Sequence, residues 1–170
     1  MNASVAFAVE RPVYEEIKLC RSEELPKARE FYEKIARRAF ELFEARNCKP
    51  GHDWEDWFRA EAELLRPVPV EMNEKAEAIV VRATVLGFDA TELKVSVEPW
   101  RLIIVGQKEQ FAEIGEKVFY VDWNPCEIYR VVRLPSAVNP EYATAKLHAG
   151  VLELMLPLSK KSAAAKPGEK

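Results

Sequence analysis

The polar and apolar positions of the first third of the chain follow the period of an α-helix. Between about residues 22 and 47, apolar side chains recur at spacings of three, four and one, which places them on one stripe. The stripe consists of Leu25, Ala28, Phe31, Tyr32, Ile35, Ala39, Leu42 and Phe43. Ser22 is the expected N-cap, and Pro50-Gly51 is expected to follow the end of the helix, because proline and glycine interrupt helices.

A second amphipathic helix is predicted after Gly51. Asp53 is its expected N-cap, acidic residues follow in its first turn, and Pro67 is expected to lie beyond its end. Its large apolar side chains are expected largely on one side: Trp54, Trp57, Phe58, Leu64 and Leu65. Two such helices with a short turn between them predict an αα-hairpin, packed on itself or on a partner.

After Pro69 the apolar period changes to two, which is typical of β-strands with one apolar face. Residues 102–105 are apolar throughout, as in a strand that is covered on both faces. The predicted strands cover residues 79–85, 93–97, 102–105, 118–123 and 128–134 and a closing hairpin at 145–156. About seven short strands with turn signals between them indicate an antiparallel β-sandwich.

The predicted fold class is therefore α+β by composition. An N-terminal α-helical hairpin precedes an all-β, immunoglobulin-like antiparallel sandwich. The expected divisions are an N-terminal arm at 1–20, the helical hairpin at 21–66, the sandwich at 67–158 and a flexible tail at 159–170.

Composition and charge exclude several classes of function. The 170 residues carry a net charge of −3 with no basic patch in the folded part, which argues against nucleic acid as a partner. No run approaches the ~20 apolar residues that a membrane-spanning helix needs, so no membrane partner is expected. Cys20, Cys48 and Cys126 are odd in number and widely spaced, which favours a reducing cytoplasm over a disulfide framework.

The sequence offers little for catalysis. Its six glycines are too scattered to form a phosphate-binding loop, and its two histidines, His52 and His148, lack the spacing of metal ligands. Both histidines are expected at the surface, and Cys126 is expected to be an inert thiol. We therefore expect no catalytic residue, no metal and no cofactor.

Several motifs resemble, in order and spacing, the α-crystallin domain of small heat-shock proteins. They are the turn Val85-Leu86-Gly87-Phe88, the strands 93–97 and Leu102-Ile103-Ile104-Val105-Gly106, the segment 128–135 that ends in Leu-Pro, and the closing signature carried by Ala145, Gly150 and Leu152. The resemblance covers roughly residues 70–158. Residues 35–57 resemble a short bacterial helical domain of unknown function.

The resemblance implies an ATP-independent chaperone (a holdase) that binds unfolded or partially folded client proteins. In this family, apolar residues on two strands near a sheet edge line a groove for short apolar segments. The implied groove residues are Leu93, Val95, Val97, Ala145 and Leu147. For each of them, an ordinary place in the core is the alternative.

The resemblance also implies at least a homodimer. In bacterial and archaeal members, a strand on the long loop pairs with the partner subunit, and the alternative is a local hairpin within one subunit. The implied interface residues are Val118, Phe119, Tyr120, Val121, Trp123 and Arg133. The tail lacks the family's Ile-x-Ile/Val motif, which docks on a neighbouring dimer, and this weighs against large shells.

Three further expectations depend on departures from the family. Ala149 replaces the usual asparagine of the closing turn, so either a different turn or local strain is expected. Val68-Pro69-Val70 is expected to be a linker, with the filling of a neighbour's groove as the less favoured alternative. The aromatic residues of the helices, Phe31, Trp54, Trp57 and Phe58, are expected to bind clients, dock on the sandwich or mediate assembly.

A rival interpretation comes from another class of protein. The chain is then an adaptor or structural protein that uses the sandwich as a dimerisation scaffold and the helices as a module for one partner. Promiscuity separates the two interpretations, because a holdase acts on several unrelated proteins and an adaptor binds one.

Overall fold

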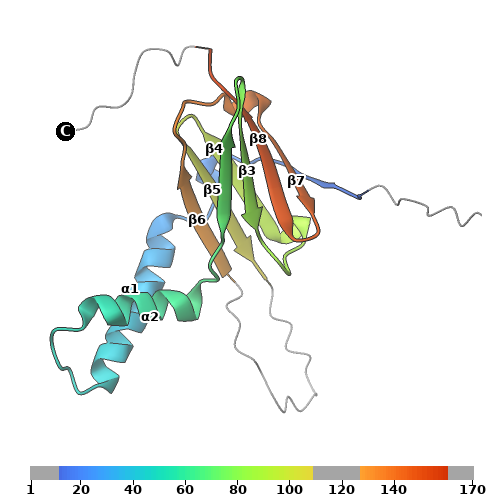
Figure 1. Cartoon of the computed structure of the whole chain (residues 1–170). Coiled ribbons are helices and arrows are strands. Elements are labelled where there is room, and N and C mark those ends of the chain that lie inside the picture. Colours follow the sequence, from blue (N-terminus) through green and yellow to red (C-terminus); the bar gives the residue numbers. More distant parts are fainter. Residues whose placement is uncertain (1–11, 109–126, 161–170) are drawn as a thin grey trace, which may run out of the picture.

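The computed structural model describes residues 12–108 and 127–160 of the chain. Its strands are β1 (Glu15–Ile17), β2 (Val70–Glu74), β3 (Ala78–Thr84), β4 (Leu93–Glu98), β5 (Arg101–Gln107), β6 (Glu127–Arg133), β7 (Thr144–His148) and β8 (Val151–Pro157). Its helices are α1 (Ala28–Ala45) and α2 (Asp53–Leu64), with short 3₁₀ helices η1 (Ser22–Glu24), η2 (Ala90–Glu92) and η3 (Pro140–Tyr142). Figure 1 shows the two helices beside β6, at one side of the strands.

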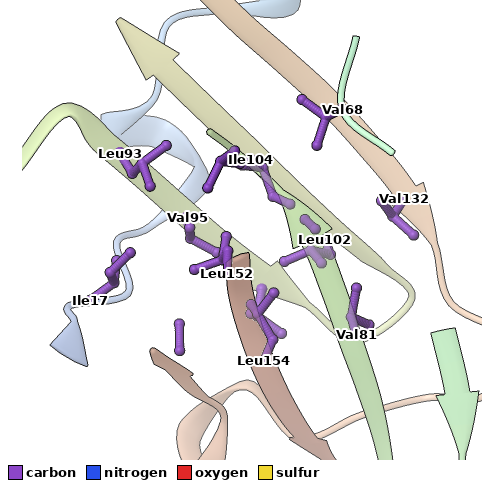
Figure 2. Close-up of a cluster of buried hydrophobic side chains, with 14 of the residues drawn as sticks. Ile17, Val68, Val81, Leu93, Val95, Leu102, Ile104, Val132, Leu152 and Leu154 are labelled. Carbon is purple, nitrogen blue, oxygen red and sulfur yellow. The ribbon is translucent and has the colours of Figure 1, made fainter. Parts of the chain in front are cut away.

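The strands form two antiparallel sheets that pack face to face. One sheet has five strands in the order β1-β7-β8-β3-β2, and the other has three in the order β4-β5-β6. Their facing side chains form the larger hydrophobic core, in which Val81, Leu152 and Leu154 of the first sheet meet Leu102 and Ile104 of the second (Figure 2). The predicted helical hairpin followed by an antiparallel sandwich is confirmed.

Most of the described strands were predicted correctly from the alternation of apolar residues. The strands predicted at 79–85, 93–97, 102–105 and 128–134 correspond to β3, β4, β5 and β6. The strand predicted at 118–123 lies outside the described residues. Neither β1 nor β2 was predicted, and both lie at an edge of the five-stranded sheet.

The closing hairpin has a tight turn in which both central residues adopt positive φ. Ala149 has φ 47° and Gly150 has φ 75°, so the turn keeps the expected conformation and the alanine carries the strain. A Cβ on Gly150 would lie 3.2 Å from the Cα of Leu86, and the Val85 amide donates a hydrogen bond to the Gly150 carbonyl at 2.8 Å. Gly150 thus meets a conformational and a steric requirement at once.

Both helices begin at positions other than those predicted. Ser22 begins η1 rather than capping α1, and Lys27 occupies the N-cap position of α1. Pro26 lies between η1 and α1. A proline disfavours helical backbone angles in the residue before it, here Leu25, and this separates the two helices. In α2, Asp53 is the first helical residue, and His52 occupies the N-cap position.

The side of α2 on which the large apolar residues were predicted is only partly buried. Trp54 and Phe58 are 75% and 61% exposed, whereas Asp56 and Ala60 are buried. Asp56 accepts hydrogen bonds from Arg46, with Nη2 2.5 Å from Oδ2, so a partly buried ion pair joins α2 to the end of α1. This contact lowers the pKa of the Asp56 carboxyl.

The helical hairpin packs on the outer face of the three-stranded sheet. Phe31 stacks on Tyr129 with ring centroids 4.6 Å apart, and Lys34 pairs with Glu127 at 3.0 Å. Ile103 and Val105 belong to the same buried cluster as Phe31, which explains why residues 102–105 are apolar throughout: alternate side chains of β5 face the sandwich core and the helices.

Candidate functional site

The candidate groove lies between β4 and β7, where the two sheets of the sandwich meet at one side. β4 is an edge strand of the three-stranded sheet, and β7 lies between β8 and the short strand β1. All five residues predicted for the groove are buried and belong to one hydrophobic cluster: Leu93, Val95, Val97, Ala145 and Leu147. The structure therefore brings them together, and their role in binding stays a prediction.

A segment of the chain itself, Val13–Cys20, lies in this groove. β1 pairs antiparallel with β7, with Ile17 opposite Ala145, and the chain then crosses to β4, where the Cys20 amide donates to the Val95 carbonyl at 2.9 Å. Figure 2 shows Ile17 at the edge of the core cluster, beside Val95 and Leu93 of β4. We call Val13–Cys20 the groove segment.

Over residues 16–19 the groove segment alternates between exposed and buried side chains, as a strand on a sheet edge does. Ile17 is only 7% exposed and Leu19 is half-buried against the same cluster, whereas Glu16 and Lys18 face the solvent. Sequence analysis missed this segment. The one available signal was the pair of aliphatic residues two positions apart, Ile17-Lys18-Leu19.

Three side-chain contacts hold the ends of the groove segment. At the start, the His148 Nδ1–H donates a hydrogen bond to the Val13 carbonyl at 2.8 Å, and the Tyr14 ring packs on His148 with centroids 4.8 Å apart. At the end, the Cys20 thiol donates to the Val95 carbonyl at 3.4 Å, and burial raises the pKa of that thiol. The Cys20 thiol thus helps to fix the segment to β4.

Two cavities lie beside the groove segment. A cavity of about 700 Å³ lies between residues 18–24, the end of β4 at Ser96–Glu98 and η3. A second cavity of about 370 Å³ lies between Glu16–Leu19 and the start of β7. Space for further chain therefore exists on both sides of the segment.

The remaining predicted residues lie elsewhere. Arg133 is exposed at the end of β6, and residues 118–123 and Cys126 lie outside the described part of the chain. Val68 is buried in the core of its own sandwich and β2 begins at Val70, which disagrees with the alternative that 68–70 fills a neighbour's groove. Phe31 is buried between α1 and the three-stranded sheet, so it docks the helices on the sandwich and is not an exposed client contact.

The described residues contain little that suggests other chemistry. Within 12–108 and 127–160, no group of three or more His, Cys, Asp or Glu side chains is arranged to hold a metal ion. His52 is exposed, and its Nδ1 lies 2.8 Å from a carboxylate oxygen of Glu55. No helix in this part of the chain combines the length and the apolar character needed to span a bilayer.

The two-sheet arrangement with a lateral groove defines an α-crystallin-type sandwich. The family model described as Hsp20/alpha crystallin family matches residues 71–169, which is more than half of the chain. The chain belongs to this family, whose members are non-enzymatic chaperones that usually act without ATP and typically oligomerise. A second model, described as a protein of unknown function (DUF2934), matches residues 30–66, the helical hairpin.

Solved structures of small heat-shock proteins are similar to this chain. A Del-C4 mutant of hsp14.1 from Sulfolobus solfatataricus P2 is 30% identical, with 62% of this chain and 82% of that chain covered and a TM-score of 0.48. Heat shock protein 16.0 from Schizosaccharomyces pombe is 16% identical, with coverage of 62% and 98% and a TM-score of 0.48. A small heat-shock protein from Xylella fastidiosa is 22% identical, with coverage of 62% and 94% and a TM-score of 0.46. No curated protein sequence matches.

Proposed function

We propose that this protein is an ATP-independent holdase that binds exposed apolar segments of unfolding proteins and keeps them from aggregating. Its membership of the Hsp20/alpha crystallin family carries the proposal. The apolar groove between β4 and β7 supports it, because an apolar strip beside an edge strand suits an extended chain segment. The odd number of cysteines favours the cytoplasm as the place of action.

The proposed client site consists of Leu93, Val95, Val97, Ala145 and Leu147. Burial of one aliphatic side chain contributes roughly 1.5–3 kcal/mol, so two or three anchors give weak binding once the costs of association are subtracted. Weak and repeated contacts suit a holdase, which must release its clients. Several grooves in one oligomer raise the overall affinity without any new contact.

We also propose a homodimer in which the segment 118–123 pairs with the partner subunit. Its proposed interface residues are Val118, Phe119, Tyr120, Val121 and Trp123. Among the described strands, β2 pairs with β3 alone and ends one sheet, so its outer edge is open to such a strand. The apolar alternation of 118–123 supports this arrangement, because an apolar strand is costly to leave exposed. Arg133 stays a proposed interface residue.

The experiment that tests the holdase proposal measures light scattering of three unrelated proteins heated with increasing amounts of this chain. We expect scattering to fall for all three without nucleotide, and added ATP should change nothing. An equal mass of an unrelated globular protein is the control. Failure on all three contradicts the proposal.

A second candidate, the adaptor, is favoured by one observation. Four aromatic side chains of the helical hairpin are more than half exposed: Tyr32, Phe40, Trp54 and Phe58. Such rings are typical anchors of a protein interface. Failure to suppress aggregation, together with tight binding of a single partner that replacement of Trp54 and Phe58 abolishes, supports the adaptor.

A further inference from the structure

We propose that a groove between α1 and α2, on the solvent side of the helical hairpin, binds an arginine side chain that a partner protein presents among apolar residues. We call this groove the hairpin groove. The proposal rests on the second candidate function, in which the helices bind one partner, and it is independent of the holdase function.

The helical hairpin has two apolar faces, and the sandwich covers one of them. Phe31 and Leu42 of α1 belong to the buried cluster that joins the hairpin to the three-stranded sheet. On the other face, Tyr32 and Phe40 of α1 are 62% and 59% exposed. Since both rings are more than half exposed, the described part of the chain leaves this face open to a partner.

The hairpin groove is a cavity of about 340 Å³ on this second face. Three aromatic rings line it: Phe40 and Phe43 of α1, whose ring centroids are 6.0 Å apart, and Trp57 of α2. Ala36 and Ala39 also line it, and their small side chains leave space beside the rings. The cavity therefore suits a side chain with a long aliphatic part.

The charged residues that line the hairpin groove are both acids, Asp53 and Asp56. Asp56 is buried and pairs with Arg46. Asp53 is exposed, and no cationic side chain within residues 12–108 and 127–160 forms an ion pair with it. A cation supplied by a partner is therefore the electrostatic complement of this groove.

Arg46 shows which kind of cation suits this site. Its guanidinium carbon lies 5.2 Å from the centroid of the Phe43 ring, and the same guanidinium pairs with Asp56. An arginine of the chain itself is thus held by an aromatic ring and a carboxylate. Phe40, Trp57 and Asp53 offer the same two kinds of group to a second arginine. Arginine is favoured over lysine, because its guanidinium is planar and less strongly hydrated and stacks on rings.

The surroundings of the hairpin groove indicate which residues accompany the incoming arginine. The Tyr32 ring packs on Trp57 with centroids 4.6 Å apart, and Trp54 is 75% exposed. Apolar contacts around a charged anchor exclude water from it, as they do around interface hot spots. The partner is therefore expected to present apolar side chains beside its arginine, as an amphipathic helix does when they lie one turn away on each side.

The test measures, by fluorescence anisotropy, how two labelled peptides bind to the full chain. Each peptide is an amphipathic helix with leucine one turn before and one turn after its central residue, which is arginine in one peptide and citrulline in the other. Citrulline keeps the length of arginine and carries no charge. We expect the arginine peptide to bind at least tenfold more tightly. Equal binding of the two peptides, or binding of neither, overturns the inference.

Asp53→Asn tests whether the arginine meets the expected carboxylate. It should weaken binding of the arginine peptide at least fivefold and change binding of the citrulline peptide less than twofold. The matched control is Glu61→Gln, which removes an exposed acid of the same helix that does not line the hairpin groove. Equal losses in the two variants would mean that the peptide responds to the overall charge of α2, and this contradicts the site.

Phe40→Ala tests the aromatic wall and should weaken binding of the arginine peptide at least fivefold. Its control is Tyr142→Ala, which removes a 68% exposed ring of the sandwich and should weaken binding less than twofold. Light scattering of Phe40→Ala tests for a second copy of the chain in the groove. We expect the molar mass of the unaltered chain, and a lower mass would show that a second copy occupies the groove and overturn the inference.

The aggregation assay separates this inference from the proposed functions. Asp53→Asn should suppress aggregation as well as the unaltered chain does, and a loss of suppression would mean that unfolded clients occupy the hairpin groove, which contradicts the inference. Peptide binding that depends on Asp53, with no aggregation suppressed by any form of the chain, supports the hairpin groove and contradicts the holdase. Tight binding of a single partner that Asp53→Asn leaves unchanged supports the adaptor and contradicts the hairpin groove as its site.

Discussion

Phe31 of α1 stacks on Tyr129 of β6, with ring centroids 4.6 Å apart and planes 29° from parallel. This contact lies at the centre of the cluster that joins the helical hairpin to the three-stranded sheet. Lys34 reaches Glu127 beside it, and the Arg66 amide donates to the Glu127 carbonyl at 2.9 Å. The hairpin is thus fixed to the sandwich at both its entry and its exit.

Replacement of Phe31 by alanine should destabilise this attachment. Phe31 is 3% exposed, and loss of a buried phenylalanine typically lowers the free energy of unfolding by about 3–5 kcal/mol. Urea unfolding followed by tryptophan fluorescence measures the change. The control is Phe40→Ala on the same helix, which is 59% exposed and should shift stability by only about 0.5 kcal/mol. Equal shifts in the two variants would show that the stacking contact does not hold the hairpin.

Deletion of residues 112–124 tests the proposed strand exchange. If the segment pairs with the partner subunit, the deletion should reduce the molar mass measured by light scattering from that of a dimer to that of a monomer. Circular dichroism checks that the sandwich is retained. A dimer that survives the deletion means that the segment stays within its own subunit.

The strands that could be predicted from the sequence are those in which every second side chain faces the core. β3, β4 and β8 show this alternation over six or seven residues, which is long enough to be unambiguous. β1 was missed because it is three residues long and contributes one fully buried side chain, Ile17. So short a pattern is common in polar sequence and does not by itself predict a strand.

The sequence indicated residues that the structure brings together, but it did not indicate the segment that covers them. Val95 and Leu147 alternate in the same way whether they line a groove or lie in a core. In the structure both are buried in the cluster that also contains Ile17. The orientation of α2 was unpredictable for another reason. Trp54 and Phe58 share one side of α2, and the sequence does not say whether that side faces α1 or the solvent. In the structure both rings are exposed, and it is Asp56, paired with Arg46, that is buried.

Ala149 in the closing turn is a site where stability should increase. Its φ of 47° is unfavourable for alanine and well tolerated by asparagine, so Ala149→Asn should raise the free energy of unfolding by about 0.5–1 kcal/mol. The melting temperature measures the gain. The neighbouring Gly150→Ala is the matched control and should lower stability, since its φ of 75° disfavours any residue with a Cβ and that Cβ would lie 3.2 Å from the Cα of Leu86. A melting temperature that falls in Ala149→Asn would contradict the assignment of strain to this residue.

The ion pair between Asp56 and Arg46 should make stability depend on pH in acid. Hydrogen bonding to Arg46 lowers the pKa of Asp56 from its ordinary value of 3.8. A carboxyl whose pKa is lower in the folded state stabilises the fold above its unfolded pKa, and that stabilisation is lost as the pH falls through the folded pKa. Asp56→Asn should therefore be less stable than the wild type between pH 5 and 7, and the difference should shrink below about pH 4. Urea midpoints across this range measure the effect, with the exposed Glu61→Gln on the same helix as control. If the urea midpoints of wild type and Asp56→Asn fall in parallel as the pH is lowered, the ion pair does not supply the stabilisation.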